Sequence, residues 1–314
     1  MKRIAFMFPG QGSQAIGMGK ELYEKYPEVQ KIYQQANEFL DKDLMDLMFN
    51  GPEEDLTQTE NAQPALLLSS SVVNTLLSKE GIQPAVTVGH SLGEYSALVA
   101  AGSLSLKDAL PLVALRGQLM EEAFPSGQGS MAAVLGLSES EIVQALQGLN
   151  TDEVIDIANL NCPGQIVISG TKQGLELAEP VLKEAGARRV ILLNVSGPFH
   201  SRLMKPASER FAEQLDKVEI SDADIPVYAN VTATAITEKD RIKKLLVEQL
   251  YSPVRFEESI KNIIAEGIDA FVEVGNGKVL SGLVKKIDRK IPTFSVQDSA
   301  SMDKLIKWYK GDEA

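Results

Sequence analysis

Ser91 lies in a pattern that can carry out nucleophilic chemistry. In the run Gly89-His90-Ser91-Leu92-Gly93, a glycine stands two residues on either side of the serine. The apolar run at 85–88 predicts a strand before the pattern, and the small residues at 95–101 predict a helix after it. A serine placed this way is typical of a nucleophile elbow, which lifts the hydroxyl above the edge of a sheet. We therefore expect Ser91 to be a nucleophile, the alternative being a structural turn.

The helix expected after Ser91 can also stabilise negative charge. The first backbone N–H groups of a helix have no partner within it, and this helix begins at the serine. The N–H of Leu92 is therefore expected to donate to the oxygen of a bound acyl group.

A serine needs a base to become a nucleophile at neutral pH, and the usual base is histidine. The chain has two histidines, His90 and His200. His90 adjoins Ser91, and adjacent side chains of an extended segment point to opposite faces, so His90 is poorly placed. This favours His200 as the base. No Asp or Glu is identifiable as its orienting group, which leaves three arrangements open: a full triad, a Ser–His dyad, and a histidine oriented by a backbone carbonyl.

Arg116 stands among apolar residues of a helix predicted from Ser105 to about Phe124. An arginine on such a face is costly unless paired, because it cannot lose its charge. An internal Asp or Glu would satisfy it, and periodicity alone favours that interpretation. A substrate carboxylate held by the planar guanidinium is the alternative.

The composition narrows the class of protein. A chain of 314 residues with 44% hydrophobic and 24% charged residues predicts about two globular domains. No run approaches a membrane span and no signal peptide is evident, so we expect a cytoplasmic protein without a membrane segment. The net charge of −12 argues against nucleic-acid binding. The single cysteine, Cys162, excludes an internal disulfide, and no metal site is expected.

The first elements are expected to bring a loop beside Ser91. A buried strand at 4–8 is followed by the glycine-rich loop 9–14, whose spacing fits neither a dinucleotide fingerprint nor a P-loop. We interpret it as a tight loop whose N–H groups face a site at the carboxyl end of the strand. Residues 27–80 read as helical, with a start signal at 61–64, and form the crossover to the strand before Ser91.

Residues 130–193 predict a unit of their own. The order of elements is β-α-β-β-α-β, which is typical of the ferredoxin-like motif. Its strands are expected at 132–136, 154–159, 165–169 and 189–193, and its helices at 139–147 and 172–185. We expect an α/β fold in which a small domain, 129–197, is inserted into a larger domain formed by 1–128 and 198–314. The later elements are expected as a helix ending near 217, a strand at 226–229, helices at 241–250 and 254–265, a strand at 270–274, a basic helix at 279–289 and a final strand at 293–296.

Several motifs occur together in one order along nearly the whole chain. They are Phe8-Pro9-Gly10-Gln11-Gly12-Ser13-Gln14, Gln63-Pro64, Gly89-His90-Ser91-Leu92-Gly93-Glu94, Arg116-Gly117, Asn161-Cys162-Pro163-Gly164-Gln165 and Gly197-Pro198-Phe199-His200-Ser201. In this set the chain resembles the malonyl-CoA:acyl-carrier-protein transacylases. The resemblance implies a hydrolase-like large domain with a parallel sheet and a ferredoxin-like small domain, in agreement with the elements above.

The resemblance also implies a ping-pong reaction. Ser91, activated by His200, would attack the thioester of malonyl-CoA while the N–H groups of Gln11 and Leu92 hold the oxyanion. The malonyl group would then pass to the phosphopantetheine thiol of acyl carrier protein, for fatty-acid or polyketide synthesis. No cofactor is implied, because the CoA thioester is a substrate.

The remaining site residues are likewise implied by the resemblance. Arg116 would pair with the malonate carboxylate, and the backbone of Gln249 would position His200. Substrate contacts are implied for Gln63, Phe199 and Asn161. The chain departs from the family pattern at Cys162, where serine is frequent, and at Pro111, and neither residue has an implied catalytic role.

An acidic carrier protein and an acidic enzyme repel each other unless a local basic surface intervenes. The densest basic run is Lys278, Lys285, Lys286, Arg289 and Lys290, and a second candidate is Arg188 with Arg189. We expect transient docking through Lys285, Lys286 and Arg289; a solvated helix face is the alternative. We expect the enzyme itself to be a monomer.

Two other functions compete with transfer. A serine hydrolase such as a thioesterase uses the same elbow and base when water reaches the acyl-serine. A non-catalytic module that binds CoA or a carrier has no use for Ser91 or His200, so the presence of both argues against it.

Overall fold

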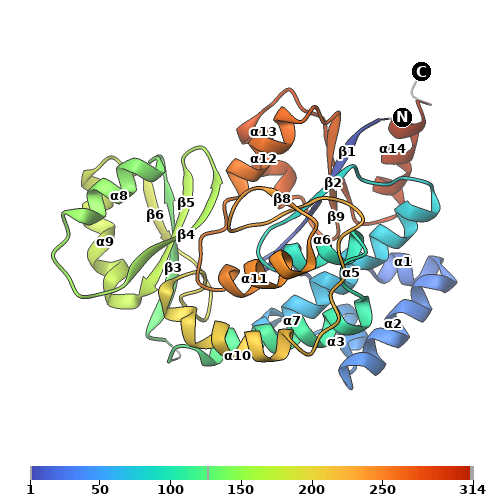
Figure 1. Cartoon of the computed structure of the whole chain (residues 1–314), viewed down its shortest axis with the longest axis horizontal. Coiled ribbons are helices and arrows are strands. Elements are labelled where there is room, and N and C mark those ends of the chain that lie inside the picture. Colours follow the sequence, from blue (N-terminus) through green and yellow to red (C-terminus); the bar gives the residue numbers. More distant parts are fainter. Residues whose placement is uncertain (1, 126, 312–314) are drawn as a thin grey trace.

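The chain forms a large parallel sheet and a smaller antiparallel one, each with its own helices (Figure 1). The structure is a computed structural model, which describes residues 2–125 and 127–311. Within these residues the large sheet has six strands in the order β10-β9-β1-β2-β7-β8, and only β7 and β8 pair antiparallel. Its strands are β1 (Ile4–Phe8), β2 (Val86–Gly89), β7 (Val227–Tyr228), β8 (Ala235–Ile236), β9 (Ala270–Val274) and β10 (Thr293–Val296).

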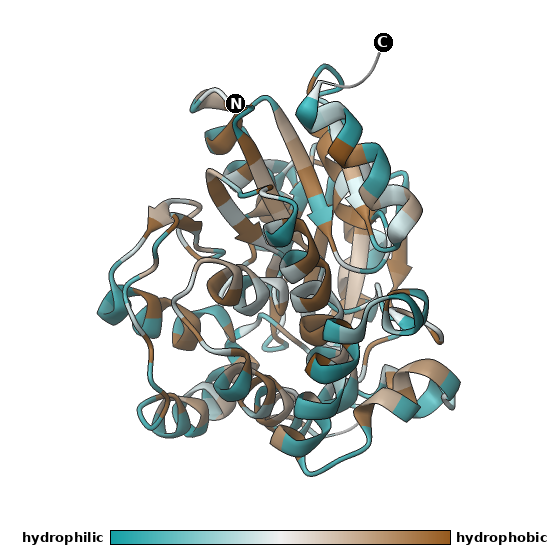
Figure 2. Ribbon diagram, turned by 90° about the vertical axis from the view of Figure 1, so that its right-hand side faces the viewer, coloured by the Kyte–Doolittle hydropathy of each residue, from teal (hydrophilic) through white to brown (hydrophobic). Residues whose placement is uncertain are grey.

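Helices cover both faces of this sheet (Figures 1 and 2). The helices before the small sheet are α1 (Lys20–Lys25), α2 (Pro27–Leu40), α3 (Leu44–Asn50), α4 (Glu53–Thr57), α5 (Thr59–Lys79), α6 (Gly93–Ala100) and α7 (Leu106–Glu122). Those after it are η1 (Arg202–Met204), α10 (Lys205–Leu215), α11 (Lys239–Gln249), α12 (Phe256–Ala265), α13 (Val279–Ile287) and α14 (Ser299–Lys310).

Strand β1 lies inside the large sheet, between β9 and β2, and every residue in it is buried. Ile4, Phe6 and Phe8 point into a core shared with α5, whereas Ala5 and Met7 point into a second core under α12 and α13. A parallel strand buried on both faces reads as a continuous apolar run, and this one does. Its carboxyl end, followed by Gln11, therefore lies at a fixed place beside the end of β2.

The small sheet contains β3 (Gly129–Leu135), β4 (Ile155–Cys162), β5 (Gln165–Thr171) and β6 (Arg189–Leu192), in the order β4-β5-β3-β6. All of its pairings are antiparallel, and α8 (Glu139–Gln147) and α9 (Lys172–Glu184) cover it. This is the predicted ferredoxin-like arrangement. β4 also joins the large domain, because Leu160 N donates to Val254 O (2.9 Å) and Val254 N donates to Ala158 O (2.8 Å).

The predicted fold class is therefore confirmed, with local differences. The helix expected to start within 61–64 begins at Thr59, and its N-cap residue Gln58 forms no side-chain capping hydrogen bond. The sequence analysis missed two elements: the two-residue strand β8, and α14, which Asp298 caps. The proposed domain limits at 128/129 and 197/198 stay a prediction.

None of the helices in residues 2–125 and 127–311 is long and apolar enough to span a lipid bilayer.

Candidate active site

Ser91 lies on a sharp turn between β2 and α6, as the nucleophile elbow requires. Its φ of +51° lies in the left-handed region, which is strained for a residue with a side chain. The flanking glycines permit the turn: a Cβ on Gly89 would lie 1.8 Å from Gly93 C, and one on Gly93 would lie 2.0 Å from Phe8 O. Neither position therefore has room for a side chain.

His200 is hydrogen-bonded to the hydroxyl of Ser91. Its Nε2 lies 2.7 Å from Ser91 Oγ, and its Nδ1 lies 2.8 Å from the backbone oxygen of Gln249. A carbonyl only accepts, so Nδ1 carries the proton and Nε2 is free to accept from the serine. Among the described residues no carboxylate bonds to His200. The orienting group is thus a backbone carbonyl, one of the three arrangements that the sequence left open.

His200 is held in its neutral form. Only 4% of the residue is exposed, and this burial, reinforced by the charge of Arg116, lowers the pKa of His200 to about 3. Near neutral pH the imidazole of His200 is therefore unprotonated, which is the state that a general base needs.

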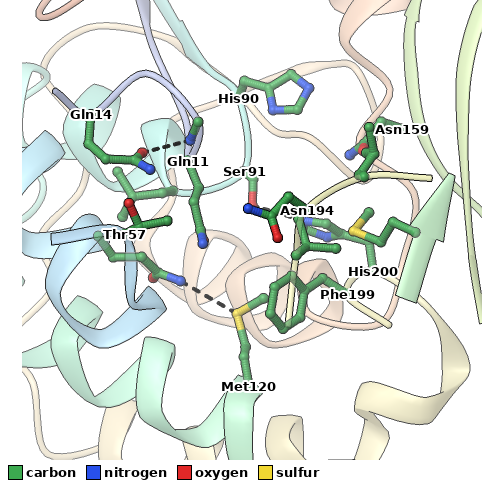
Figure 3. Close-up of a pocket in the computed structure, with 16 residues that line it drawn as sticks. Gln11, Gln14, Thr57, His90, Ser91, Met120, Asn159, Asn194, Phe199 and His200 are labelled. Atoms are coloured by element: carbon green, nitrogen blue, oxygen red, sulfur yellow. Dashed lines mark hydrogen bonds between the residues drawn. The ribbon is translucent and has the colours of Figure 1, made fainter. Parts of the chain in front are cut away.

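A cavity of about 170 Å³ opens above Ser91 (Figure 3). Because β1 and β2 run parallel with Phe8 opposite Gly89, the loops that follow them meet, and Gln11 and Leu92 both line the cavity. In the described part of the chain neither backbone N–H of these two residues donates a hydrogen bond to another protein group. The arrangement leaves two donors for a developing oxyanion.

Arg116 is fully buried below Ser91. Its guanidinium donates to Gln63 Oε1 (2.8 Å), Gln249 Oε1 (2.9 Å) and Ser91 Oγ (3.2 Å), while its Nε has no hydrogen-bond partner among the residues that the structure describes. No ion pair to this guanidinium occurs within the described residues. The internal Asp or Glu partner that periodicity favoured is thus not found, and neutral amides hold the cation instead. Arg116 itself lies behind the cavity wall.

The other implied contacts fall in different places. Gln63 and Phe199 line the cavity, and Gln63 Nε2 donates to the sulfur of Met120 at 3.7 Å. Asn161 does not line it; its Oδ1 lies 2.8 Å from His90 Nε2. His90 is thereby engaged away from Ser91, as the sequence analysis expected.

Sequence reasoning missed a buried polar network under the elbow. Asn230 Oδ1 accepts from Ser91 N (2.8 Å), its Nδ2 donates to Gly89 O (2.7 Å), and its own N–H donates to Glu94 (3.1 Å). The side chain of Gln249 also belongs to this network, donating to Ser91 O and to Glu94. A signal for Asn230 was present, because it directly follows the strand predicted at 226–229, where ligand-facing residues of a parallel sheet occur. Further cavity residues that were missed are Gln14, Thr57, Met120, Met131, Asn159 and Asn194.

Comparison with known proteins gives a consistent result. The family described as acyl transferase domain matches residues 5–307. The malonyl CoA-acyl carrier protein transacylase of Bacillus subtilis (strain 168) is 55% identical over 311 residues, covering 99% of this chain and 98% of that protein. The protein of the same name from Staphylococcus aureus (strain MRSA252) is 46% identical over 313 residues, covering 99% and 100%.

Solved structures agree in fold. The crystal structure of an acyl carrier protein S-malonyltransferase from Vibrio cholerae has a TM-score of 0.95 and 46% identity, and the match covers 97% of this chain and 100% of that one. A malonyl-transacylase in complex with its type II PKS acyl-carrier protein also has a TM-score of 0.95, with 40% identity and coverage of 98% and 99%.

Proposed function

The chain belongs to the acyl transferase domain family, and from that premise we propose that it transfers a malonyl group from malonyl-CoA to the phosphopantetheine thiol of acyl carrier protein. The observation that carries the proposal is the hydrogen-bonded pair of Ser91 and His200 above a buried arginine that has no carboxylate partner in the described structure. The relatives named above act on malonyl groups and carrier proteins according to their names.

The first half of the reaction loads the enzyme. His200 Nε2 takes the hydroxyl proton as Ser91 Oγ bonds to the thioester carbon, and the carbonyl oxygen becomes an oxyanion that faces the N–H groups of Gln11 and Leu92. When the tetrahedral intermediate collapses, the C–S bond breaks and His200 returns the proton to the CoA sulfur. The product is a malonyl ester of Ser91 with free CoA.

The second half reverses these roles. The carrier thiol gives its proton to His200, and its sulfur attacks the ester carbon. The bond to Ser91 Oγ then breaks, and the serine recovers its proton from His200. Because the same base serves both halves, the enzyme ends in its starting state.

Arg116 would select the malonyl group over an uncharged one. A guanidinium held by neutral amides keeps its full charge, and a carboxylate is a stronger acceptor than an amide oxygen. We propose that the substrate carboxylate replaces Gln63 Oε1 as the partner of Arg116, since Gln63 stands between the cavity and the guanidinium.

Intact-protein mass spectrometry tests the transfer directly. After brief exposure to malonyl-CoA we expect a single malonyl adduct that persists in water and disappears when holo carrier protein is added. Decay of the adduct in buffer alone, at the rate seen with carrier protein, would instead indicate a thioesterase. Absence of any adduct would indicate a binding module.

The carrier protein is proposed to dock at the basic end of α13. Lys285, Lys286 and Arg289 are exposed there, and Lys286 Nζ donates to Gln165 Oε1 (2.9 Å) at the start of β5. The basic surface therefore lies where the two domains meet. Such a position suits an acidic partner, which must overcome the overall negative charge of this chain.

Charge reversal tests this surface. We expect Lys285→Glu with Lys286→Glu to raise the KM for carrier protein by roughly fivefold to thirtyfold, because each exposed charge pair contributes about 0.2–1 kcal/mol and reversal adds repulsion. The effect should shrink at high salt, and loading from malonyl-CoA should stay near the wild-type rate. Lys304→Glu with Lys307→Glu on α14 makes the same charge change at exposed positions and serves as the control. Equal effects of the two pairs, or parallel loss of loading, would refute docking at α13.

The proposal requires no cofactor, because the CoA thioester is itself the acyl donor. A monomeric state and a cytoplasmic location stay predictions.

A further inference from the structure

Glu94 is a buried carboxylate that the mechanism above does not use. It lies in the first turn of α6, three residues after Ser91, and only 2% of it is exposed. Its Oε2 accepts from Gln249 Nε2 (2.7 Å) and from the backbone N–H of Asn230 (3.1 Å). Within the described residues it forms no ion pair. Burying an ionised carboxylate without a cationic partner costs free energy. The presence of Glu94 at this place therefore needs an explanation.

The two partners of Glu94 together hold every reacting group. Gln249 accepts from Arg116 through Oε1, donates to Ser91 O through Nε2 (3.0 Å), and orients His200 through its backbone carbonyl. Asn230 accepts from Ser91 N and donates to Gly89 O, so it fixes the turn that carries the nucleophile. One carboxylate thus contacts both residues that hold the nucleophile, the base and the arginine, through the side-chain amide of Gln249 and the backbone N–H of Asn230.

Glu94 provides the shortest of three hydrogen bonds that hold the NH₂ group of Gln249, since the bond to Glu94 Oε2 is 2.7 Å long, against 3.0 Å to Ser91 O and 3.2 Å to Asn230 Oδ1. An ionised carboxylate only accepts hydrogen bonds, so Gln249 must turn its NH₂ group toward Glu94 and its oxygen toward Arg116. A guanidinium only donates, so the flipped amide would set NH₂ against Arg116 and lose that bond. A neutral side chain at position 94 can donate as well as accept, so it no longer demands the NH₂ group, and only the longer bonds to Ser91 O and Asn230 Oδ1 then hold it on that side.

We propose that Glu94 is a positioning residue for malonyl selection, whose negative charge keeps Gln249 Oε1 on Arg116 and so holds the guanidinium ready for the substrate carboxylate. This inference rests on the proposed function, because the position of Arg116 affects only a substrate whose carboxylate binds to it.

The environment places the titration of Glu94 near neutral pH. Burial raises the pKa of Glu94 to about 7, although the hydrogen bonds from Asn230 and Gln249 and the charge of Arg116 oppose the rise. Burial opposes the charged forms of the other titratable groups around it, since it lowers the pKa of His90 and His200 and raises the pKa of Tyr95. Acidification below about pH 7 therefore neutralises Glu94.

The test compares the rates at which malonyl-CoA and acetyl-CoA load Ser91. We expect Glu94→Gln to reduce malonyl loading by about 10- to 100-fold, the usual effect of losing hydrogen bonds to a buried charge, and acetyl loading by clearly less. The variant Arg116→Ala lacks the guanidinium that would bind the malonyl carboxylate. In that background Glu94→Gln should leave the malonyl-to-acetyl ratio of loading rates unchanged. Glu94→Asp keeps the charge and should restore part of the ratio.

Glu273→Gln is the matched control for removing a buried carboxylate. Glu273 lies on β9, is fully buried, and accepts the N–H groups of Leu280 and Ser281 at the start of α13, away from the cavity. Its substitution should lower thermal stability without changing the substrate ratio. If Glu94→Gln lowered the loading rates of malonyl-CoA and acetyl-CoA by the same factor, Glu94 would be only a structural support of the elbow, and the inference would be wrong.

A measurement on the unmodified enzyme covers the case in which Glu94→Gln does not fold. The wild-type malonyl-to-acetyl ratio should fall as the pH drops from 8 to 6, since both substrates carry the same CoA phosphates and their titration cancels. A ratio that is flat over this range contradicts the inference. Failure of wild-type enzyme to load malonyl at all would instead contradict the proposed function, so the two failures are distinguishable.

Discussion

Replacing Ser91 with alanine is expected to abolish the malonyl adduct and with it all carrier-dependent transfer. The substitution removes one hydroxyl at the mouth of a cavity, and the elbow keeps its backbone because Asn230 holds Ser91 through the main-chain N–H. No other hydroxyl lies within hydrogen-bond distance of His200 Nε2 among the described residues. We therefore expect loss of chemistry without loss of fold, which mass spectrometry and a thermal unfolding curve measure together.

Ser96→Ala provides the comparison for this experiment. Ser96 is buried on the same helix, α6, and its hydroxyl has no hydrogen-bond partner in the described structure. We expect this variant to load malonyl at the wild-type rate. A malonyl adduct on Ser91→Ala, mapped by peptide digestion to another side chain, would show that the elbow is not the nucleophile.

The sequence predicts the elbow well because its causes are local. Gly89 and Gly93 are required by contacts within a few residues and with the end of β1, and the apolar and small-residue runs on either side determine the strand and the helix. The exclusion of His90 also holds, although for a different geometric reason. Ser91 is in the left-handed region and not extended, and His90 is directed to Asn161.

The polar network beneath the elbow could not be predicted in the same way. Glu94 was visible only as part of a motif, and its partners Asn230 and Gln249 lie 136 and 155 residues further along the chain. They meet it because β7 pairs with β2, with Tyr228 opposite Val88, and because α11 ends beside the turn. Neither the pairing of strands nor the packing of a helix end is encoded by spacing alone.

Arg116 is a second residue whose partners could not be predicted from the sequence. Periodicity correctly predicted a buried arginine on α7. Because buried charges are usually paired, it also favoured an internal carboxylate as the partner. The fold instead brings two glutamine oxygens to the guanidinium, from α5 and from the end of α11. Only the tertiary arrangement distinguishes a cation that is already neutralised from one that is available to a substrate.

Replacing His200 with alanine is expected to lower the rate of Ser91 loading by about 10²–10⁴-fold, the usual contribution of a positioned general base. The imidazole is neutral, its tautomer is fixed by Gln249 O, and its Nε2 lies 2.7 Å from Ser91 Oγ. Without it the serine must lose its proton to water. The oxyanion donors at Gln11 and Leu92 stay in place, which is why residual loading is expected and not complete loss.

His90→Ala is the matched control for the histidine substitution. His90 also lines the cavity, but its ring bonds to Asn161 and packs against Phe256, with ring centroids 5.6 Å apart. Rapid-quench measurement of malonyl loading should therefore show a loss of less than about tenfold for His90→Ala, since only packing and one neutral hydrogen bond are removed. If the two variants exchanged these effects, the base would be His90. The bond between His200 and Ser91 would then have to be a resting contact that the reaction does not use.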